Sequence, residues 1–179
     1  MRRNMVLDSM DIERILRRIT GEILEIHKNP ENLAIVGIHT RGVYLAKRIH
    51  RLISQMESID VETGNIDINL YRDDWTRIAH HPEVRSSDIG FDLNSKEIVL
   101  IDDVLYTGRT VRAAMDALID FGRPNRIELC VLIDRGHREL PIQANYVGKF
   151  IETKRTDQVN VMLSECDGED RVDVLSPAN

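Results

Sequence analysis

The sequence predicts an α/β protein with a central, mostly parallel β-sheet flanked by helices. Three apolar runs, at 33–38, 98–101 and 127–134, lack polar alternation, which is typical of strands buried on both faces of a sheet. Segments with the three- and four-residue spacing of amphipathic helices lie between these runs. This alternation favours parallel strands joined by right-handed crossovers.

Length and composition indicate one soluble domain. The 179 residues suffice for a single core, so we expect one domain over 1–179 with a small hood or lid region. The net charge is −6, so binding to a nucleic acid would need a local basic face. Cys130 and Cys166 are far apart and lack metal-site spacing, and we find neither a signal peptide nor a segment able to span a bilayer. We therefore predict a cytoplasmic protein with no membrane partner.

The N-terminal third predicts a helix, a strand and a second helix. Apolar residues recur at helical steps over 8–27, behind an Asp8 or Ser9 cap, and the Asn-Pro pair at 29–30 ends that helix. The run 33–38 follows as a strand, then a short polar loop, and then a helix over 43–55.

The rest of the chain predicts five strands and one helix. Apolar and polar residues alternate from Ile66 to Tyr71, the pattern of a strand with one buried face. Residues 72–95 are polar and irregular, and loops of this length are often lids over sites. The strand at 98–101 leads into a helix over 109–121 that ends at Gly122. We expect the C-terminal part to contain strands at 127–134, 146–151 and 159–163 and a tail at 165–179.

The most informative segment is 98–110, Ile-Val-Leu-Ile-Asp-Asp-Val-Leu-Tyr-Thr-Gly-Arg-Thr. Its strand brings Asp102 and Asp103 to the carboxyl edge of the sheet, where open α/β sheets bind ligands. The turn at 107–110 supplies backbone N–H groups, two hydroxyls and a helix N-terminus, which together suit an anion. A ligand with both a diol and a phosphate, such as a ribose 5-phosphate, would satisfy all these groups. The segment lacks the glycine spacing of a Walker loop or a dinucleotide fingerprint, and the alternative is an ordinary turn capped by the two acids.

The whole string resembles the phosphoribosyl-diphosphate (PRPP) signature of the type I phosphoribosyltransferases. The resemblance implies their fold, with a hood or lid region beside the sheet, and Mg²⁺ bound mainly through PRPP. Asp102 and Asp103 would be catalytic residues that hold the ribose hydroxyls or the Mg²⁺. The signature residues expected to contact substrate are Asp102, Asp103, Val104, Leu105, Tyr106, Thr107, Gly108, Arg109 and Thr110.

A second loop that resembles the family follows the first buried strand. Thr40 and Arg41 stand before Gly42, and a cation with backbone donors at this edge would hold the leaving diphosphate. The resemblance implies a catalytic and substrate-binding role for Arg41, and the family often has a cis peptide bond here. Within the long loop, Arg72 is a candidate catalytic lid residue and Arg85 a candidate substrate contact, although each also fits a solvated loop arginine.

The base is predicted to be a pyrimidine. Purine phosphoribosyltransferases carry an acid just before the Thr-Gly of the signature, where this chain has Tyr106. The run Ile-Asp-Arg-Gly-His-Arg-Glu-Leu-Pro-Ile at 133–142 resembles the PyrR family, as do the segments 67–74 and 122–124. Proteins of that family regulate pyrimidine operons by binding RNA and act as uracil phosphoribosyltransferases. The resemblance implies PRPP, uracil and UMP or UTP as ligands, with Arg135 and Val159 beside the base.

The same resemblance implies leader mRNA of a pyrimidine operon as a partner. His137 and Arg138 match the RNA-binding Arg-Gly-His-Arg element of the family. Further residues would extend a basic face that attracts phosphates: Arg17, Arg18 and Lys154. The first helix departs from the family pattern, which has a threonine and a histidine where this chain has Arg17 and Gly21. Arginines spaced along a helix are also typical of a solvated face.

Three other functions remain open. The chain could be an RNA-binding attenuator with vestigial catalysis, or a phosphoribosyltransferase for another pyrimidine such as orotate. The third is a receiver-like domain with an acidic phosphoacceptor pocket, which the phosphate cradle directly after the two acids argues against. The family resemblance also implies a homodimer or a higher homo-oligomer.

Overall fold

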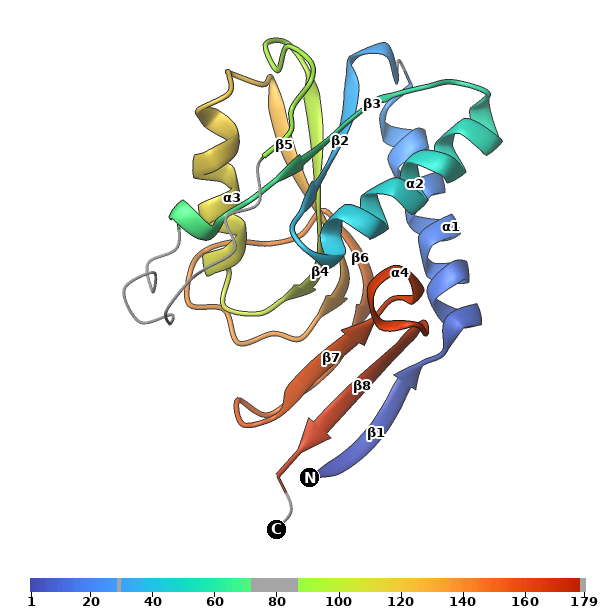
Figure 1. The fold of residues 1–179 in the computed structure, drawn as a ribbon, viewed down its shortest axis with the longest axis vertical. Coiled ribbons are helices and arrows are strands. Elements are labelled where there is room, and N and C mark those ends of the chain that lie inside the picture. The colour runs from blue at the N-terminus through green and yellow to red at the C-terminus, as the bar shows by residue number, and fades with distance from the viewer. Residues whose placement is uncertain (29, 72–86, 178–179) are drawn as a thin grey trace.

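A five-stranded parallel sheet forms the centre of the computed structural model, which describes residues 1–28, 30–71 and 87–177. The strand order is β3-β2-β4-β5-β6 (Figure 1). The strands are β2 (Leu33–Ile38), β3 (Glu62–Ile66), β4 (Glu97–Leu105), β5 (Arg126–Asp134) and β6 (Tyr146–Phe150). All four pairings are parallel, which confirms the predicted fold class.

Helices cover both faces of this sheet. The helices α1 (Ser9–Ile26) and α2 (Arg41–Glu57) lie on one face, and α3 (Arg109–Ile119) lies on the other (Figure 1). The alternation of side chains along β4 explains the two layers. Val99 and Ile101 belong to the core under α1 and α2, whereas Ile98 and Leu100 belong to the core under α3. Every residue of β2 is buried, as a strand between two helical layers requires.

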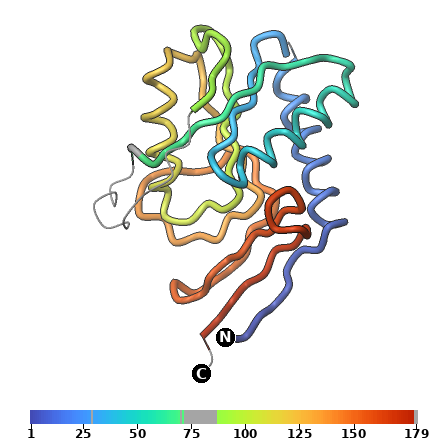
Figure 2. The backbone as a smooth tube through the Cα atoms, viewed as in Figure 1, coloured from blue at the N-terminus to red at the C-terminus, as the bar shows by residue number. Residues whose placement is uncertain are grey.

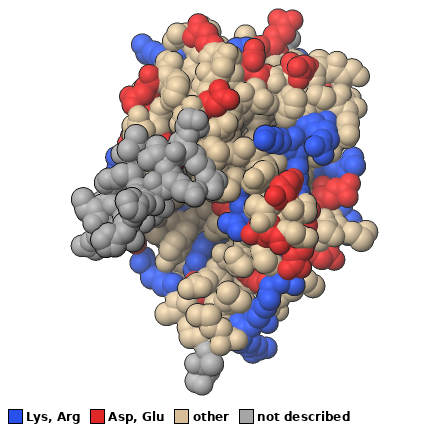
Figure 3. Space-filling model, in the orientation of Figure 1, with Lys and Arg blue, Asp and Glu red and all other residues tan. Residues whose placement is uncertain are grey.

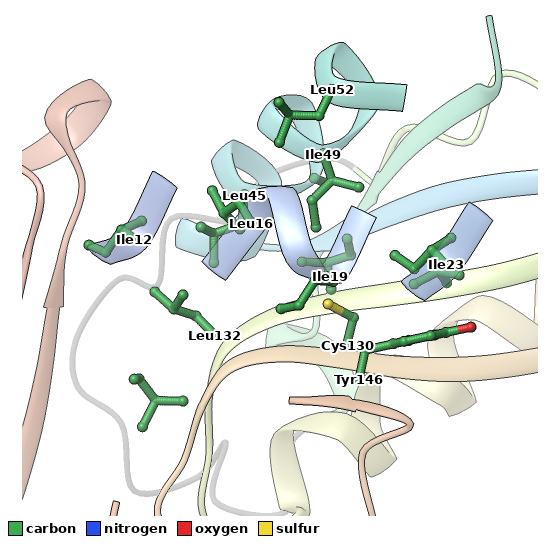
Figure 4. Packing of buried hydrophobic residues seen from close by; sticks show 14 of the residues in the cluster. Ile12, Leu16, Ile19, Ile23, Leu45, Ile49, Leu52, Cys130, Leu132 and Tyr146 are labelled. Carbon is green, nitrogen blue, oxygen red and sulfur yellow. The ribbon is translucent and has the colours of Figure 1, made fainter. Parts of the chain in front are cut away.

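The larger core lies between α1, α2 and the sheet. Figure 4 shows isoleucine and leucine side chains of both helices pointing toward Cys130 of β5 and Tyr146 of β6. Ile12, Ile19 and Ile23 of α1 are fully buried, which confirms the predicted apolar face of this helix. Asp8 caps α1 by accepting a hydrogen bond of 2.8 Å from the N–H of Asp11, and the Asp11 side chain completes a capping box.

A second, three-stranded antiparallel sheet forms a hood beside the parallel sheet. Its strand order is β1-β8-β7, from β1 (Arg2–Leu7), β8 (Arg171–Ser176) and β7 (Gln158–Met162). The short helix α4 (Ser164–Asp167) connects β7 to the turn before β8. We call residues 158–176 together with β1 the hood. Figure 2 shows the first and last strands running side by side, so that both chain ends lie at the same end of the molecule.

The structure corrects two predictions about elements. Residues 165–179 are not a tail, because β8 occupies the centre of the hood sheet and Val172 is fully buried there. The strand predicted from Ile66 to Tyr71 lies earlier, at β3, and Asn69–Tyr71 form a 3₁₀ turn instead. Asp67 accepts a hydrogen bond of 2.9 Å from the N–H of Asn69, and this local turn competes with the extended pairing of a strand.

The remaining connections are short or irregular. A 3₁₀ turn at Pro30–Asn32 leads into β2. Of the predicted lid at 72–95, residues 72–86 lie outside the described residues, and 87–95 run without regular structure apart from a bridge between Asp88 and Asn65. Within the described part of the chain, no helix has both the length and the apolar character that a membrane crossing needs.

Candidate active site at the carboxyl edge of the sheet

Two adjacent carboxylates stand where β4 ends. Asp102 is 6% exposed, and Asp103 beside it is partly exposed. The backbone fixes both, since Asp102 Oδ1 accepts a 2.9 Å hydrogen bond from the N–H of Asp103 and Asp103 Oδ1 accepts one of 2.9 Å from the N–H of Val104. The two side chains also interact with each other, so hydroxyls at this strand end would meet both acids.

Burial dominates the electrostatics of this pair. Loss of solvation raises the pKa of Asp102 well above its ordinary value, and the charge of Asp103 raises it further. Burial also raises the pKa of Asp103, although the guanidinium of Arg41 opposes that shift. Two anions held this close and this dry favour a ligand that brings hydroxyl donors or positive charge.

The turn after β4 begins a helix and presents its N-terminus to the same edge. Gly108 is the N-cap of α3 with φ of 92°, a left-handed conformation that favours glycine. A Cβ atom there would lie 3.3 Å from Ile142, so the neighbouring loop also needs the glycine. The Thr107 hydroxyl lies 3.4 Å from the N–H of Arg109. Thr107, Gly108, Arg109 and Thr110 thus lie at the N-terminus of α3, where the sequence predicts an anion cradle.

The loop 135–142 supports this turn from the neighbouring strand end. Thr107 O accepts a hydrogen bond of 2.9 Å from the N–H of Glu139, and Leu105 O accepts one of 3.1 Å from the N–H of Arg135. Arg138 contributes most, because its Nη1 donates to the carbonyl of Tyr106 at 3.0 Å and its Nη2 pairs with Asp134. Arg138 therefore organises the loop from within, which the sequence analysis did not foresee.

The loop predicted to bind diphosphate approaches the two acids closely. Thr40 is the N-cap of α2, and the His39–Thr40 peptide bond is cis, as the resemblance implied. Gly42 allows the approach, because a Cβ atom there would lie 2.3 Å from the carbonyl oxygen of Ile101. The N-termini of α2 and α3 therefore meet at one edge of the sheet, on either side of Asp102 and Asp103.

Arg41 is held by the hood. Its Nε and Nη2 donate to Asp167 Oδ2 and Oδ1 at 3.1 and 2.8 Å, a bidentate pair. A second arginine of α2, Arg48, pairs with Glu165 and Asp170 of the same segment. Figure 3 shows the acidic side chains gathered over α4 beside basic side chains. The sequence did not predict a role for Asp167, because it lies in a stretch rich in acidic residues and only the fold brings it to Arg41.

The residues predicted to lie beside the base also come together. The guanidinium carbon of Arg135 lies 4.1 Å from the centre of the Tyr106 ring, and His137 meets the same ring edge-on at 6.1 Å. Arg135 is 6% exposed and donates to the carbonyl of Lys154 at 3.0 Å, while its Nε lacks a partner among the described residues. Val159 lies on β7 of the hood, which contacts β4.

The residues predicted to bind RNA have partners of their own. Arg17 donates to Glu13 at 2.9 Å, and Arg18 donates to Glu22 at 2.6 Å and to the carbonyl of Gly148 at 2.6 Å. His137 Nε2 lies 2.6 Å from the carbonyl oxygen of Thr153. Lys154 is exposed. Arg72 and Arg85, the predicted lid arginines, lie outside the described residues.

Comparison with known proteins is consistent with this geometry. Residues 2–166 match the family model described as a phosphoribosyl transferase domain. A protein of Desulfosudis oleivorans named "Bifunctional protein PyrR" is 54% identical over 177 residues, which cover 98% of each chain. A protein of the same name from Thermus thermophilus is 57% identical over 169 residues, covering 94% of this chain and 93% of the relative.

Solved structures of lower identity share the fold. The hypoxanthine phosphoribosyltransferase of Trypanosoma cruzi superposes with a TM-score of 0.73 at 16% identity, covering 98% of this chain and 97% of the other. The HGPRT-ase of Leishmania tarentolae in complex with GMP has a TM-score of 0.72 at 13% identity, with the same coverage.

Proposed function

The chain belongs to the phosphoribosyl transferase family and within it to the bifunctional PyrR proteins, and we propose that it is a uracil phosphoribosyltransferase that also regulates pyrimidine genes. The proposed reaction joins uracil to the ribose of PRPP and releases diphosphate, so that UMP forms. The second activity is binding of pyrimidine leader mRNA, which UMP or UTP controls.

One arrangement carries the enzymatic proposal. Asp102 and Asp103 lead directly into the turn 107–110, and Arg41 stands opposite at the N-terminus of α2. A ligand across this edge would meet two carboxylates, a helix N-terminus suited to a monophosphate, and an arginine suited to a second phosphate group. PRPP carries a diol, a 5-phosphate and a diphosphate, and so satisfies every part.

The proposed chemistry is a displacement at C1 of the ribose. A ring nitrogen of uracil forms the new bond as the bond to diphosphate breaks, through a transition state with oxocarbenium-ion character. Asp102 and Asp103 hold the ribose hydroxyls and stabilise the positive charge that develops on the ring. Arg41 donates to the departing diphosphate, and the turn 107–110 fixes the 5-phosphate.

Mg²⁺ fits this site as a companion of PRPP. Among the described residues no group of three or more His, Cys, Asp or Glu side chains could hold a metal ion, so a site made by the protein alone is not formed there. Asp102 and Asp103 are the residues that would face the ion, because Mg²⁺ prefers carboxylate oxygens and its charge would offset the cost of ionising these two buried acids. When bound with PRPP, Mg²⁺ neutralises negative charge on the diphosphate.

The base would lie against Tyr106 and Arg135. Tyr106 stands just before Thr107, where purine phosphoribosyltransferases carry an acid. The guanidinium of Arg135 lies over its ring, so the pair presents a phenol and a guanidinium rather than a carboxylate. The unpartnered Nε of the buried Arg135 is a donor suited to a carbonyl oxygen, of which uracil has two. This supports a pyrimidine over a purine, and orotate is the alternative substrate.

A panel of bases tests the enzymatic proposal. With PRPP and Mg²⁺, we expect UMP from uracil and no comparable product from orotate or hypoxanthine, as measured by product chromatography. Asp103→Asn should lower kcat/KM by about a hundredfold or more, as loss of transition-state stabilisation does. Asp116→Asn, which removes a carboxylate from the surface of α3, should leave the rate unchanged. Failure of the unmodified protein to form UMP would exclude the proposal.

The regulatory activity rests on the family and on the basic residues of α1. Arg17 and Arg18 are about half exposed, with guanidinium groups that could exchange their glutamate partners for phosphates. His137 and Arg138 contribute through the fold of the loop 135–142, which borders the candidate base site. Occupancy of that site by UMP would thus act on the loop directly. We further propose, from the family, a homo-oligomer located in the cytoplasm.

An RNA titration tests this second activity. We expect a pyrimidine leader hairpin to bind more tightly with UMP present than without it. Arg17→Ala should weaken binding and lower the slope of log affinity against log salt by about one. The matched control is Arg112→Ala. Arg112 pairs with Asp116 four residues along α3, just as Arg17 pairs with Glu13 four residues along α1. Equal effects of both variants, or no effect of UMP, would count against the assignment.

A further inference from the structure

We infer that Asp167 is a positioning residue of the reaction, which orients Arg41 toward the departing diphosphate. This inference rests on the proposed function and deepens it, since it assigns part of the diphosphate site to the hood. Arg41 lies at the N-terminus of α2, and Asp167 is the last residue of α4, 126 residues later in the chain.

The contact has the geometry of a fixed support. Both oxygens of Asp167 accept from the guanidinium, at 3.1 and 2.8 Å, which fixes the plane as well as the position of Arg41. The side chains are 32% and 21% exposed, so the pair lies at the rim of the site and remains accessible to a ligand.

The carboxylate is itself held by the hood. Asp167 Oδ2 also accepts a 2.9 Å hydrogen bond from the N–H of Leu163, and the thiol of Cys166 lies 3.1 Å from the same oxygen. The hydrogen bond from Arg41, followed by that from Leu163, lowers the pKa of Asp167 to about 2. Asp167 is therefore ionised at neutral pH, and contacts within the hood as well as Arg41 fix its place.

The bidentate pair leaves the outer edge of the guanidinium for a ligand. It uses Nε and Nη2, and among the described residues no hydrogen bond is formed by Nη1 of Arg41. The negative charge of Asp103 acts on the same guanidinium, and Gly42, the next residue, lies against the strand residues Ile101 and Asp102. A phosphate group between Arg41 and the ribose site would meet a donor already aligned, and binding would not have to order a flexible arginine.

The opposite role would be that of a competitor. A carboxylate on Arg41 could occupy the place of the diphosphate and have to leave before substrate binds. The Leu163 and Cys166 contacts favour the supporting role, because displacement of Asp167 would also break these bonds. The two roles predict opposite changes when the carboxylate is removed.

The test compares Asp167→Asn with Asp170→Asn. Asp170 joins the same hood segment to α2 through Arg48 but does not contact Arg41, so its variant controls for loosening of the hood. Titration calorimetry with Mg²⁺-pyrophosphate measures the affinity of the site without turnover. Steady-state kinetics with PRPP and uracil then separate KM for each substrate from kcat.

The supporting role predicts a specific pattern. Asp167→Asn should weaken pyrophosphate binding and raise KM for PRPP by about threefold to tenfold, the effect of one charge-assisted pair at a partly exposed site. KM for uracil should stay within about twofold, and Asp170→Asn should leave the pyrophosphate affinity unchanged. Asp167→Glu, which restores the carboxylate, should recover part of the affinity.

Three outcomes would overturn the inference: tighter pyrophosphate binding by Asp167→Asn, equal weakening by Asp170→Asn, and no pyrophosphate binding by the unmodified protein. The proposed function fails separately. If the unmodified protein binds pyrophosphate but forms no UMP, the enzymatic proposal is lost, while a selective effect of Asp167→Asn would still assign the support of Arg41.

Discussion

At the scale of single residues, Asp102 and Asp103 show how the acids of a candidate binding site lower the stability of the folded protein. A hydrophobic strand ends in two carboxylates, and burial raises the pKa of both. A raised pKa in the folded state means that folding disfavours the ionised form. The pair is therefore expected to destabilise the unliganded protein at neutral pH. Hydroxyl groups or cations of a bound ligand would offset this cost.

Asp102→Asn should make the unliganded protein more stable while it impairs catalysis. The folded-state pKa of Asp102 is raised, so the cost of its ionisation appears as pH rises from the ordinary range of aspartate through the folded-state pKa. The gain in Tm should thus be larger at pH 8 than at pH 5. A gain of about 1 kcal/mol corresponds to about 2–4 °C for a chain of this size.

Differential scanning calorimetry at both pH values measures this gain, with Asp116→Asn as the control for removal of an exposed carboxylate. An equal gain at pH 5 and pH 8 would show that charge burial is not its cause.

Arg138 shows that a residue singled out by a motif can also hold the fold of its own loop. The resemblance to the PyrR family implies that it belongs to an RNA-binding element. The structure turns its guanidinium inward, onto the carbonyls of Ile142 and Tyr106 and the carboxylate of Asp134. Carbonyl groups of a loop beside a sheet need hydrogen-bond donors, and which side chain supplies them cannot be read from the sequence.

At the scale of elements, the end of α1 is tied to the amino edge of the sheet. His27, the C-cap of α1, is almost completely buried. Its Nδ1 lies 2.7 Å from Glu97 of β4 and its Nε2 lies 2.6 Å from Glu128 of β5, which Tyr146 of β6 also contacts. One side chain therefore joins a helix to two strands, at the edge opposite the candidate active site.

His27→Ala should therefore destabilise the fold far more than its distance from the site suggests. Removal of the ring leaves Glu128, 7% exposed, without its nearest partner, and breaking a buried pair of this kind costs about 3–5 kcal/mol. The free energy of unfolding, measured by urea titration, reports the loss. His50→Ala removes a ring paired with the exposed Asp60 and should change stability by less than about 1 kcal/mol. Similar effects of the two variants would contradict the role of the buried network.

Element prediction succeeded where apolar patterns were strong. The buried strands β2, β4 and β5 and the helices α1, α2 and α3 were all expected, because each presents a long apolar run or an amphipathic repeat. The hood strands β1 and β8 were missed, since Arg2–Leu7 and Arg171–Ser176 are short and rich in polar residues. Their stability comes from pairing with each other across the whole chain, which no local pattern reveals.

At the scale of the whole molecule, the candidate active site is assembled from distant segments that parallel topology brings to one edge. Residues 40–42 follow β2, and residues 102–110 form the end of the adjacent strand β4 and the turn after it; this adjacency could be anticipated from the alternation of strands and helices. The contribution of Asp167 could not, because it depends on how the hood docks on α2. The sequence thus predicted candidate residues at the ends of β2 and β4, and the fold added Asp167, which contacts Arg41.

The pairing of β1 with β8 also orders events during synthesis. Arg2 pairs with Ser176, so β1 has no partner in the hood sheet until β8 has been synthesised. The parallel sheet can form earlier, because β2 to β6 are complete by Phe150. A nascent chain at that stage would hold the two carboxylates and the phosphate turn but lack Asp167. On the proposed roles, Arg41 gains its support for binding diphosphate only once the hood segment is in place.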